Sequence, residues 1–355
     1  MWTEKQEAEI TSLLRMSARI GADPLLVQAG TGNTSIKLGD ALWIKASGKW
    51  LSHAMADEML VPVSLAEARR CVARNIDISD EYAGTAGAQL KPSIETAMHA
   101  VIPDRVVVHV HSVNTIAWAV QRDGEAQLSR LLAGLPWRWI PYVRSGNKLA
   151  RAIARALLEY RHTKVFVLAN HGLVVCEQSC ESAEALLAEV ERRVQVRPRV
   201  APEPDLELMQ ALGAASGWRL PDSIEFHSLG ADRLCFETIA GGVLYPCQAM
   251  FFGARIPAAS NIASIKRALV SVGEPRPLFA LLNGGGMLIS RAMTGTEAAM
   301  LAGLVHVAQR IDGPGQVAYL TARDVRRINT GQAEGYRALM ENACMGSPLS
   351  QSSNA

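Results

Sequence analysis

The chain has 355 residues, of which 49% are hydrophobic and 20% charged, so it can bury the cores of two ordinary domains. Its 36 basic and 34 acidic side chains are well mixed and leave a net charge of +2, so a nucleic-acid partner is not expected. It shows no signal peptide and no membrane-spanning run, and its six cysteines are scattered, so a cytoplasmic protein without a membrane partner is expected.

The first predicted helix begins after Thr3, which can form a capping box with Gln6, and its apolar stripe ends at Gly21. A glycine-rich turn, QAGTGNTSIK, leads into two short strands, TSIKL and ALWIKAS. The stretch KPSIETAMHAVIP predicts a short helix with Ser93 as its N-cap and Pro103 as its terminator.

The stretch RVVVHVHSVNTIAW, which follows this helix, predicts a strand buried on both faces. Side chains alternate along a strand, so His109 and His111 point the same way and lie side by side. Buried polar groups are costly without partners, so a pair of imidazoles on a dry face needs something to hold it.

A helix near 147–160 and the strand KVFVLA come next, and the strand ends in the turn NHG, which carries His171. The strand LVVC and a helix near 181–194 complete the unit. Strands that alternate with helices indicate a layered α/β domain over residues 1–195.

The segment 196–205 has three prolines among charged residues, a composition typical of linkers. A second, smaller α/β domain is predicted over residues 206–345. The tail at 346–355 is expected to be disordered.

Residues 280–304 can be laid over residues 166–190 without a gap, and His171 then faces Gly285. One interpretation is that the second domain holds a degenerate repeat which has lost its metal-type residue. The other is that any strand, glycine turn and helix in succession look alike.

Four side chains are predicted to carry chemistry. His109 and His111 share a strand face, His171 lies in a turn at a strand end, and Glu95 lies early in the short helix. Three histidines with an open position are typical of catalytic zinc, and a nearby carboxylate is a natural general base. Alternatively, the histidines are satisfied core residues and Glu95 is a helix N-terminal acid favoured by the helix dipole. His99 is interpreted as a supporting or packing residue.

The motifs QAGTGNTSIK, KASG, KPSIETAMHA, HVHS and ANHG, in this order and spacing, resemble the class II (metal-dependent) aldolase/adducin family over about residues 8–195. They are most similar to the aldolase portion of bifunctional rhamnulose-1-phosphate aldolase/alcohol dehydrogenase proteins. The resemblance implies a layered αβα class II aldolase-like domain, followed here by the smaller α/β domain.

The resemblance also implies roles for single residues. His109, His111 and His171 match the ligands of one divalent metal ion, expected to be zinc, and Glu95 matches the catalytic acid/base. The positions that hold the substrate phosphate match Gly32, Asn33, Ser47, Gly48 and Ser93.

The sequence departs from the family pattern at Ile94, where many members have a second serine that binds phosphate. A phosphorylated substrate is therefore left open, with Thr96 as a substitute donor. Family members often take a tyrosine proton donor from a neighbouring subunit, and Tyr142 is only a weak candidate. A homo-oligomer is implied, although the second domain could cover or replace a subunit contact.

The expected function is that of a zinc-dependent aldolase, a carbon–carbon lyase of carbohydrate metabolism. It would cleave a ketose or ketose phosphate through a metal-stabilised enediolate, with the pKa of Glu95 raised towards neutrality by a dry pocket. A related epimerase, decarboxylase or dehydratase on the same scaffold is one alternative. A non-catalytic, adducin-like binding module is another.

Overall fold

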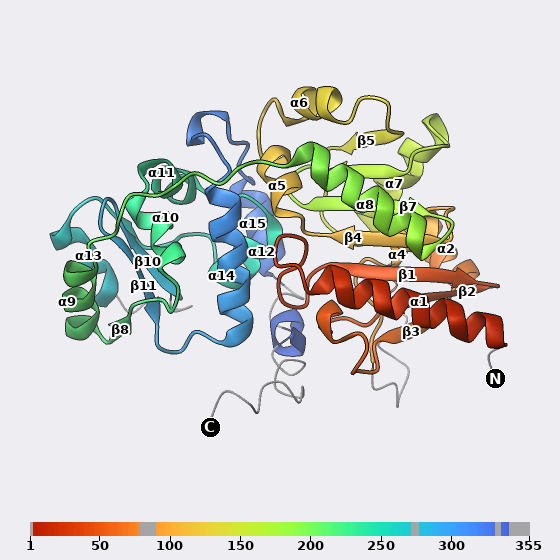
Figure 1. Cartoon of the computed structure of the whole chain (residues 1–355), viewed down its shortest axis with the longest axis horizontal. Helices are drawn as coiled ribbons and strands as arrows, with labels where there is room; N and C mark the ends of the chain where they lie inside the picture. The colour runs from red at the N-terminus through yellow and green to blue at the C-terminus, as the bar shows by residue number, and fades with distance from the viewer. Residues whose placement is uncertain (1–2, 77, 79–89, 271–276, 331–334, 341–355) are drawn as a thin grey trace.

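The computed structural model in Figure 1 describes residues 3–76, 78, 90–270, 277–330 and 335–340. We call the part from α1 to α8 the first region, and the part from α9 to residue 340 the second region. The predicted tail lies outside the described residues. No helix in the described ranges is long and apolar enough to cross a membrane.

One sheet of seven strands forms the centre of the first region, in the order β3-β2-β1-β4-β7-β6-β5. Only β5 and β6 pair in parallel among these strands, and the other neighbours pair antiparallel. The strands are β1 (Asn33–Leu38), β2 (Ala41–Lys45), β3 (Leu60–Ser64), β4 (Val106–Val110), β5 (Trp137–Ile140), β6 (Val165–Leu168) and β7 (Gly172–Glu177). The valine-rich β4 thus lies in the middle of the sheet, as its composition predicts.

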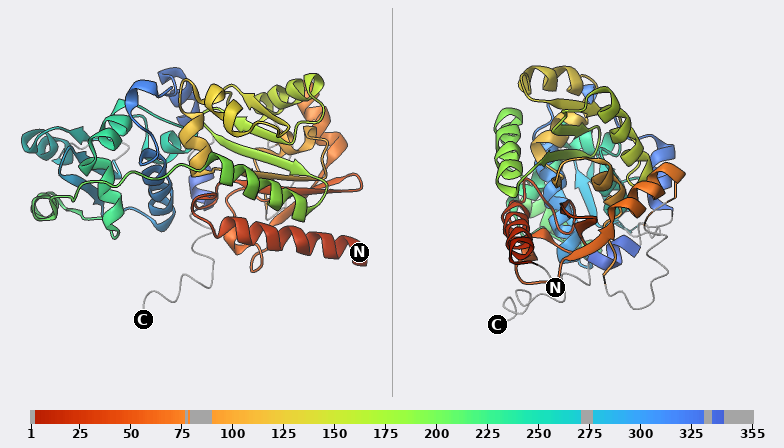
Figure 2. Two further views of the ribbon diagram at one scale, coloured as in Figure 1. Left: turned by 45° about the horizontal axis from the view of Figure 1, so that its top comes forward. Right: turned by 90° about the vertical axis from the view of Figure 1, so that its right-hand side faces the viewer.

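Helices cover both faces of this sheet, and α1 and α8 lie side by side on one of them (Figure 2). That face also carries α5 and α6, whereas α2, α4 and α7 pack on the other. The helices are α1 (Glu4–Gly21), α2 (Leu65–Arg74), α4 (Thr96–Val101), α5 (Val113–Ala119), α6 (Gly124–Leu131), α7 (Asn147–Glu159) and α8 (Cys180–Val194), with a 3-10 turn η1 (Leu51–His53). The first region is therefore a layered αβα domain.

Alternation along β4 divides its side chains between the two helical layers. Val106, Val108 and Val110 pack in the core beneath α1 and α8, whereas Val107 packs with Met98 on the other side. The histidines of β4 share the side of Val107. The capping box predicted at the start of α1 is also confirmed.

The predicted N-cap of the short helix is wrong. Helix α4 begins at Thr96 with Glu95 in the N-cap position, and Ser93 lies outside it. The Ser93 hydroxyl accepts a hydrogen bond from the Glu95 backbone N–H at 3.2 Å, which closes a turn before the helix. Glu95 is thus held at the junction of turn and helix.

The second region contains a sheet of four strands in the order β8-β11-β10-β9. The strands are β8 (Trp218–Arg219), β9 (Ala258–Ala259), β10 (Phe279–Leu282) and β11 (Gly286–Ser290). The helices are α9 (Leu206–Ser216), α10 (Ser228–Ala231), α11 (Arg233–Gly241), α12 (Pro246–Phe252), α13 (Ile262–Val270), α14 (Gly295–Ala308) and α15 (Ala322–Asn329), with 3-10 turns η2 (Ile224–His227) and η3 (Pro314–Gln316).

The two regions share one apolar core. Residues of α5, such as Ile116, are buried in the same cluster as Leu304 of α14 and Phe279 of β10. A backbone bridge between Gln121 and Val317 adds to this contact. The segment 196–205 crosses between the regions without helix or strand, and the predicted division there stays a prediction.

We expect Gly172→Ala to destabilise the fold, because a Cβ at this position would lie 2.5 Å from the backbone oxygen of Val110. Forcing β4 and β7 apart should lower the free energy of unfolding by about 1–3 kcal/mol. Gly315→Ala is the matched control, since a Cβ there meets no atom within 4 Å in the described structure. Urea unfolding checks both variants, and equal midpoints would contradict the close approach.

Candidate metal centre

Three histidines, from the end of β4 and from the β6–β7 turn, meet on the α4 side of the sheet. His109 lies on β4, His111 follows it directly, and His171 lies in the turn between β6 and β7. All three are buried, and one ring nitrogen of each lies within 4.8 Å of the others. The structure thus brings together the three residues that the sequence singled out as metal ligands.

Backbone geometry places the turn that carries His171. Asn170 has a positive φ of 51°, and its side-chain amide donates to the backbone oxygens of Leu244 at 2.8 Å and Ala318 at 2.6 Å. Gly172 then allows the chain to approach β4, where any side chain would collide with Val110. The turn is therefore fixed from both sides.

Glu95 lies beside the histidine cluster and contacts two of its three members. Its Oε2 lies 3.2 Å from Nε2 of His109, and its Oε1 lies 3.4 Å from Nε2 of His171. The side chain of Asn33 donates to Oε2 at 2.9 Å, and the hydroxyl of Ser145 donates to Oε1 at 3.2 Å. The carboxylate is thus held in place by two donors outside the metal cluster.

Asn33 is itself oriented by a buried chain of polar groups. Its side-chain oxygen pairs with Nε2 of His99, and Nδ1 of His99 lies 2.7 Å from the hydroxyl of Ser35. Asn33 and His109 are also directly opposed in the pairing of β1 with β4. His99 therefore supports the site through Asn33 and is not grouped with the three histidines.

The three histidines fit a divalent metal. Nδ1 of His109 lies 3.0 Å from the backbone oxygen of Leu173, which only accepts, so this nitrogen carries the proton. In the neutral ring Nε2 of His109 is then the nitrogen that can bind a metal, and it is buried without a hydrogen-bond partner among the described residues. A bare acceptor that faces a carboxylate is unfavourable unless a cation lies between them. Neutral imidazoles in this arrangement are the ligands that zinc prefers.

Burial keeps the other site histidines neutral. It lowers the pKa of His171 to about 4, with a smaller opposing effect from Glu95, and it lowers the pKa of His111 well below its usual value. For Glu95, burial alone would raise the pKa, but the positive charge that His109, His171 and His111 carry when protonated, together with the Asn33 amide, outweighs it. The pKa of Glu95 is lowered, so the expected rise towards neutrality is wrong in the metal-free protein.

The five residues matched to phosphate positions lie around one corner of the site. A bridge between Ala46 and Pro92 places the loop of Ser47 and Gly48 beside Ser93. A Cβ on Gly32, which has a φ of 64°, would lie 2.8 Å from the backbone oxygen of His109. The side-chain amide of Asn33 donates a hydrogen bond of 3.2 Å to the hydroxyl of Ser93, so these two side chains are already bonded to each other beside Glu95.

Sequence reasoning missed Lys45, which is buried although it carries a charge. Its Nζ donates to the backbone oxygen of Gly30 at 2.7 Å and to that of Lys49 at 2.5 Å, so it ties two loops of the corner together. Burial lowers the pKa of Lys45 to about 7, against a smaller effect of Glu95. The alternation of ALWIKAS, which places Lys45 on the face of Trp43 and Ala41, gave no sign of this role.

The second region also reaches this site. The sulfur of Cys247 lies 3.5 Å from Nδ1 of His111, and the hydroxyl of Tyr336 lies 3.4 Å from the backbone oxygen of Gly30. Burial raises the pKa of the Cys247 thiol to about 12, so the thiol is neutral. Tyr142 instead packs with residues such as Val243 in a separate cluster.

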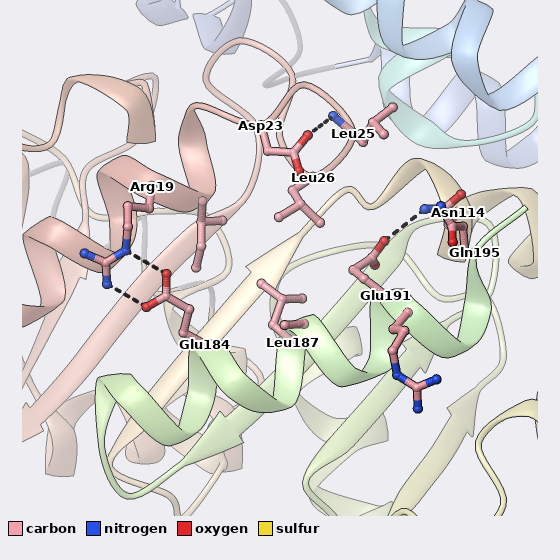
Figure 3. A pocket seen from close by; sticks show the side chains of 12 residues that line it. Arg19, Asp23, Leu25, Leu26, Asn114, Glu184, Leu187, Glu191 and Gln195 are labelled. Atoms are coloured by element: carbon pink, nitrogen blue, oxygen red, sulfur yellow. Dashed lines mark hydrogen bonds and ion pairs between the residues drawn. The ribbon is translucent and has the colours of Figure 1, made fainter. Parts of the chain in front are cut away.

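A hollow of about 520 Å³ lies between the loop after α1, α5 and α8 (Figure 3). Its charged groups are largely paired with one another: Arg19 binds Glu184 with two hydrogen bonds, and Asn114 donates to Glu191 at 3.1 Å. Helices α1 and α8 cover the opposite face of the sheet from α4. This hollow is therefore separate from the histidine site.

We expect the metal-free protein to lose stability as the pH falls below about 6.5, where histidines of an unfolded chain titrate. In the unfolded state His171 then binds a proton. In the folded state, where its pKa is about 4, it stays unprotonated. For His171 alone, the free energy of unfolding should drop by about 3 kcal/mol between these two pKa values.

Urea unfolding in chelator at pH 7 and at pH 5 measures most of this effect, about 2 kcal/mol for His171. His171→Gln should flatten the pH dependence, whereas replacement of the exposed His162 by Gln should preserve it. Equal stability of the unchanged protein at both pH values would contradict the expected proton linkage.

The chain is similar to known proteins over about its first half. A curated relative, the uncharacterized oxidoreductase YuxG of Bacillus subtilis, is 26% identical over 201 residues, which are 51% of this chain and only 29% of YuxG. The N-terminal class II aldolase domain of a conserved Thermoplasma acidophilum protein is 23% identical, with a TM-score of 0.48, over 54% of this chain and 95% of that one. L-fuculose-1-phosphate aldolase of Thermus thermophilus is 17% identical, with a TM-score of 0.38, over 53% and 93%.

A family model describes the first region as a whole. The class II aldolase and adducin N-terminal domain matches residues 12–197, which is more than half of the chain. These residues include the histidine cluster, Glu95 and the strands that position them. The chain belongs to the class II aldolase and adducin family.

Proposed function

We propose that the chain is a zinc-dependent aldolase, a lyase that cleaves a carbon–carbon bond in a ketose or ketose phosphate. The observation that carries this proposal is the contact of one carboxylate, Glu95, with two of three clustered histidines. A metal ligand set and a buried base in contact are what proton transfer next to a carbonyl requires. Membership of the family supports the same class of chemistry.

His109, His111 and His171 would hold the metal, and the lowered pKa values of His111 and His171, which keep both rings neutral at pH 7, suit that role. When bound, zinc supplies Lewis-acid polarisation of a carbonyl or hydroxyl oxygen. The carbonyl of Leu173 keeps the proton of His109 on its outer nitrogen and so presents the inner one. Three protein ligands leave a coordination position open for a substrate.

Glu95 would move the proton at the carbon next to the carbonyl. In cleavage, the hydroxyl at the breaking bond becomes a carbonyl and releases its proton, which Glu95 accepts and then delivers to the carbon that loses the bond; condensation runs these transfers in reverse. Its lowered pKa keeps it ionised and ready to accept a proton before substrate binds. Asn33 and Ser145 hold its two oxygens in fixed directions, which preserves the geometry of transfer.

The far end of the substrate would lie in the corner formed by Gly32, Asn33, Ser47, Gly48 and Ser93. The backbone N–H groups of such glycine-rich loops suit an anion or a row of hydroxyls. Ile94 adds an apolar side chain where a second hydroxyl would strengthen phosphate binding. Rhamnulose 1-phosphate and its unphosphorylated form are therefore the first pair of substrates to compare.

Two alternatives use the same residues differently. An epimerase, decarboxylase or dehydratase would need the same metal ligands and a base, and only the products separate these reactions from cleavage. A binding module without activity would have no need for a carboxylate buried against two imidazoles, which is costly to maintain. The arrangement of Glu95 therefore favours an enzyme.

Purified without chelator, the protein should carry close to one zinc per chain by elemental analysis. His109→Ala should lose most of this metal, because it removes one of three clustered ligands, whose inner nitrogen has no hydrogen-bond partner in the described part of the chain. His162→Ala, at an exposed position, serves as the control and should keep it. Absence of metal in the unchanged protein, even after incubation with zinc, would overturn the proposal.

Glu95→Gln should keep the zinc and lower kcat by at least about a hundredfold, since general base catalysis contributes about 10²–10⁴-fold. The amide preserves the size of the side chain but cannot accept the proton. Steady-state cleavage of a candidate ketose phosphate, with zinc content measured on the same samples, checks this result. If the variant turned over as fast as the unchanged protein, Glu95 would not be the acid/base of the reaction.

A further inference from the structure

The sheet of the second region repeats one half of the first sheet. The order β4-β7-β6-β5 corresponds to β8-β11-β10-β9, strand for strand. In both sets the first two pairings are antiparallel and the last is parallel. Helices α7 and α13 precede the third strand of each set, and α8 and α14 follow the second.

The central hairpins of the two sets also agree residue by residue. Leu168 pairs with Gly172 at the end of the β6–β7 hairpin, and Leu282 pairs with Gly286 at the end of the β10–β11 hairpin. Two residues after each leucine the backbone has a positive φ, 51° at Asn170 and 75° at Gly284. Shared register and shared turn geometry go beyond a chance succession of strand, turn and helix.

The second set has lost the residues that hold a metal. Gly285 occupies the turn position of His171. Strand β8 ends at Arg219, which corresponds to Val108 of β4, so it stops before the positions of His109 and His111. One set therefore carries the ligands, and the other does not.

The second region nevertheless supports two of the three ligands. Cys247, in α12, contacts the outer nitrogen of His111 at 3.5 Å. The backbone oxygens of Leu244 and Ala318 hold Asn170, which immediately precedes His171. Metal-bound histidines usually need such an outer partner, and loss of that partner weakens metal binding.

Residues 335–340 close the loops beside the cluster. A Cβ on Gly30 would lie 3.0 Å from the side chain of Met340, and one on Gly48 would lie 2.7 Å from that of Leu339. The hydroxyl of Tyr336 points to the backbone oxygen of Gly30. Both glycines are therefore packed against the second region as well as against each other.

We propose that the second region is a degenerate copy of the β4–α8 half of the first, and that it completes the metal site through Cys247 and the carbonyls of Leu244 and Ala318. This rests on the metal site of the proposed function. Cys247 is a positioning residue, which fixes the ring of His111 so that its inner nitrogen faces the metal. The second region thus supports the metal site of the first region and has no metal ligands of its own in the corresponding turn.

Metal affinity tests Cys247 directly, by competition of zinc with a chromophoric chelator and by the visible spectrum of the cobalt-loaded protein. Cys247→Ala should weaken zinc about 10–100-fold and alter the cobalt spectrum, because His111 loses its outer partner. Cys247→Ser should recover most of the affinity, since its hydroxyl still accepts. Cys235→Ala is the control, a buried cysteine of the same apolar core.

Asn170→Gly provides an independent test if Cys247→Ala does not fold. Glycine suits the positive φ at this position, as Gly284 does in the second hairpin, so the substitution removes only the contacts with the second region. Zinc affinity should fall about tenfold. If the unchanged protein binds zinc and both variants match it, the inference fails while the proposed function stands. If the unchanged protein binds no zinc, both fail together.

Discussion

Glu95 is buried with one carboxylate oxygen 3.2 Å from Nε2 of His109, and the surrounding structure compensates for the burial of this charge. The outer nitrogen of His109 donates to Leu173, so in the neutral ring the inner nitrogen is an acceptor. A buried carboxylate tolerates such a neighbour only with nearby donors or a cation. Asn33 and Ser145 supply the donors, and the open side of the three histidines suits the cation.

Asn33 can donate to Glu95 only if its side-chain amide keeps one orientation, and residues of the sheet fix that orientation. An amide side chain that can turn over would offer Glu95 an oxygen instead of a donor. His99 prevents this by binding the amide oxygen from the far side, and the hydroxyl of Ser35 holds the other ring nitrogen of His99. The polar chain from Ser35 to Glu95 is therefore a single unit, and each member is satisfied only while the others keep their places.

Close backbone approach is the second condition for the site. β4 passes between β1 and β7, and a side chain at Gly32 or Gly172 would collide with its carbonyl oxygens. Glycine at these two positions lets both neighbours reach the strand that carries His109. The valines of β4 fit the same arrangement. A strand that is paired on both edges and covered on both faces is buried, and the valine side chains are fully buried.

The shared core makes the two regions one structural unit around the site. Side chains of α5 pack with those of α14 and β10, and the turn before His171 is held by carbonyls of the second region. A change in the second region can therefore alter the metal site without touching a ligand. The second region can therefore influence the metal site although it does not carry the three histidines itself.

The sequence by itself determined the elements whose pattern is local. Alternation along β4 placed His109 and His111 on one face, the turn NHG placed His171 at a strand end, and the capping box at Thr3 started α1. These features depend on residues a few positions apart, whose spacing repeats with the period of the strand or helix.

Only the tertiary structure decided the features that depend on distant residues. The contact of Cys247 with His111 joins residues that are far apart in the chain, and no local pattern encodes it. The same holds for the burial of Lys45 and for the pKa of Glu95, which the imidazoles lower against the effect of burial. The start of α4 at Thr96 also follows from the turn at Ser93, because the hydroxyl that would cap a helix closes that turn instead.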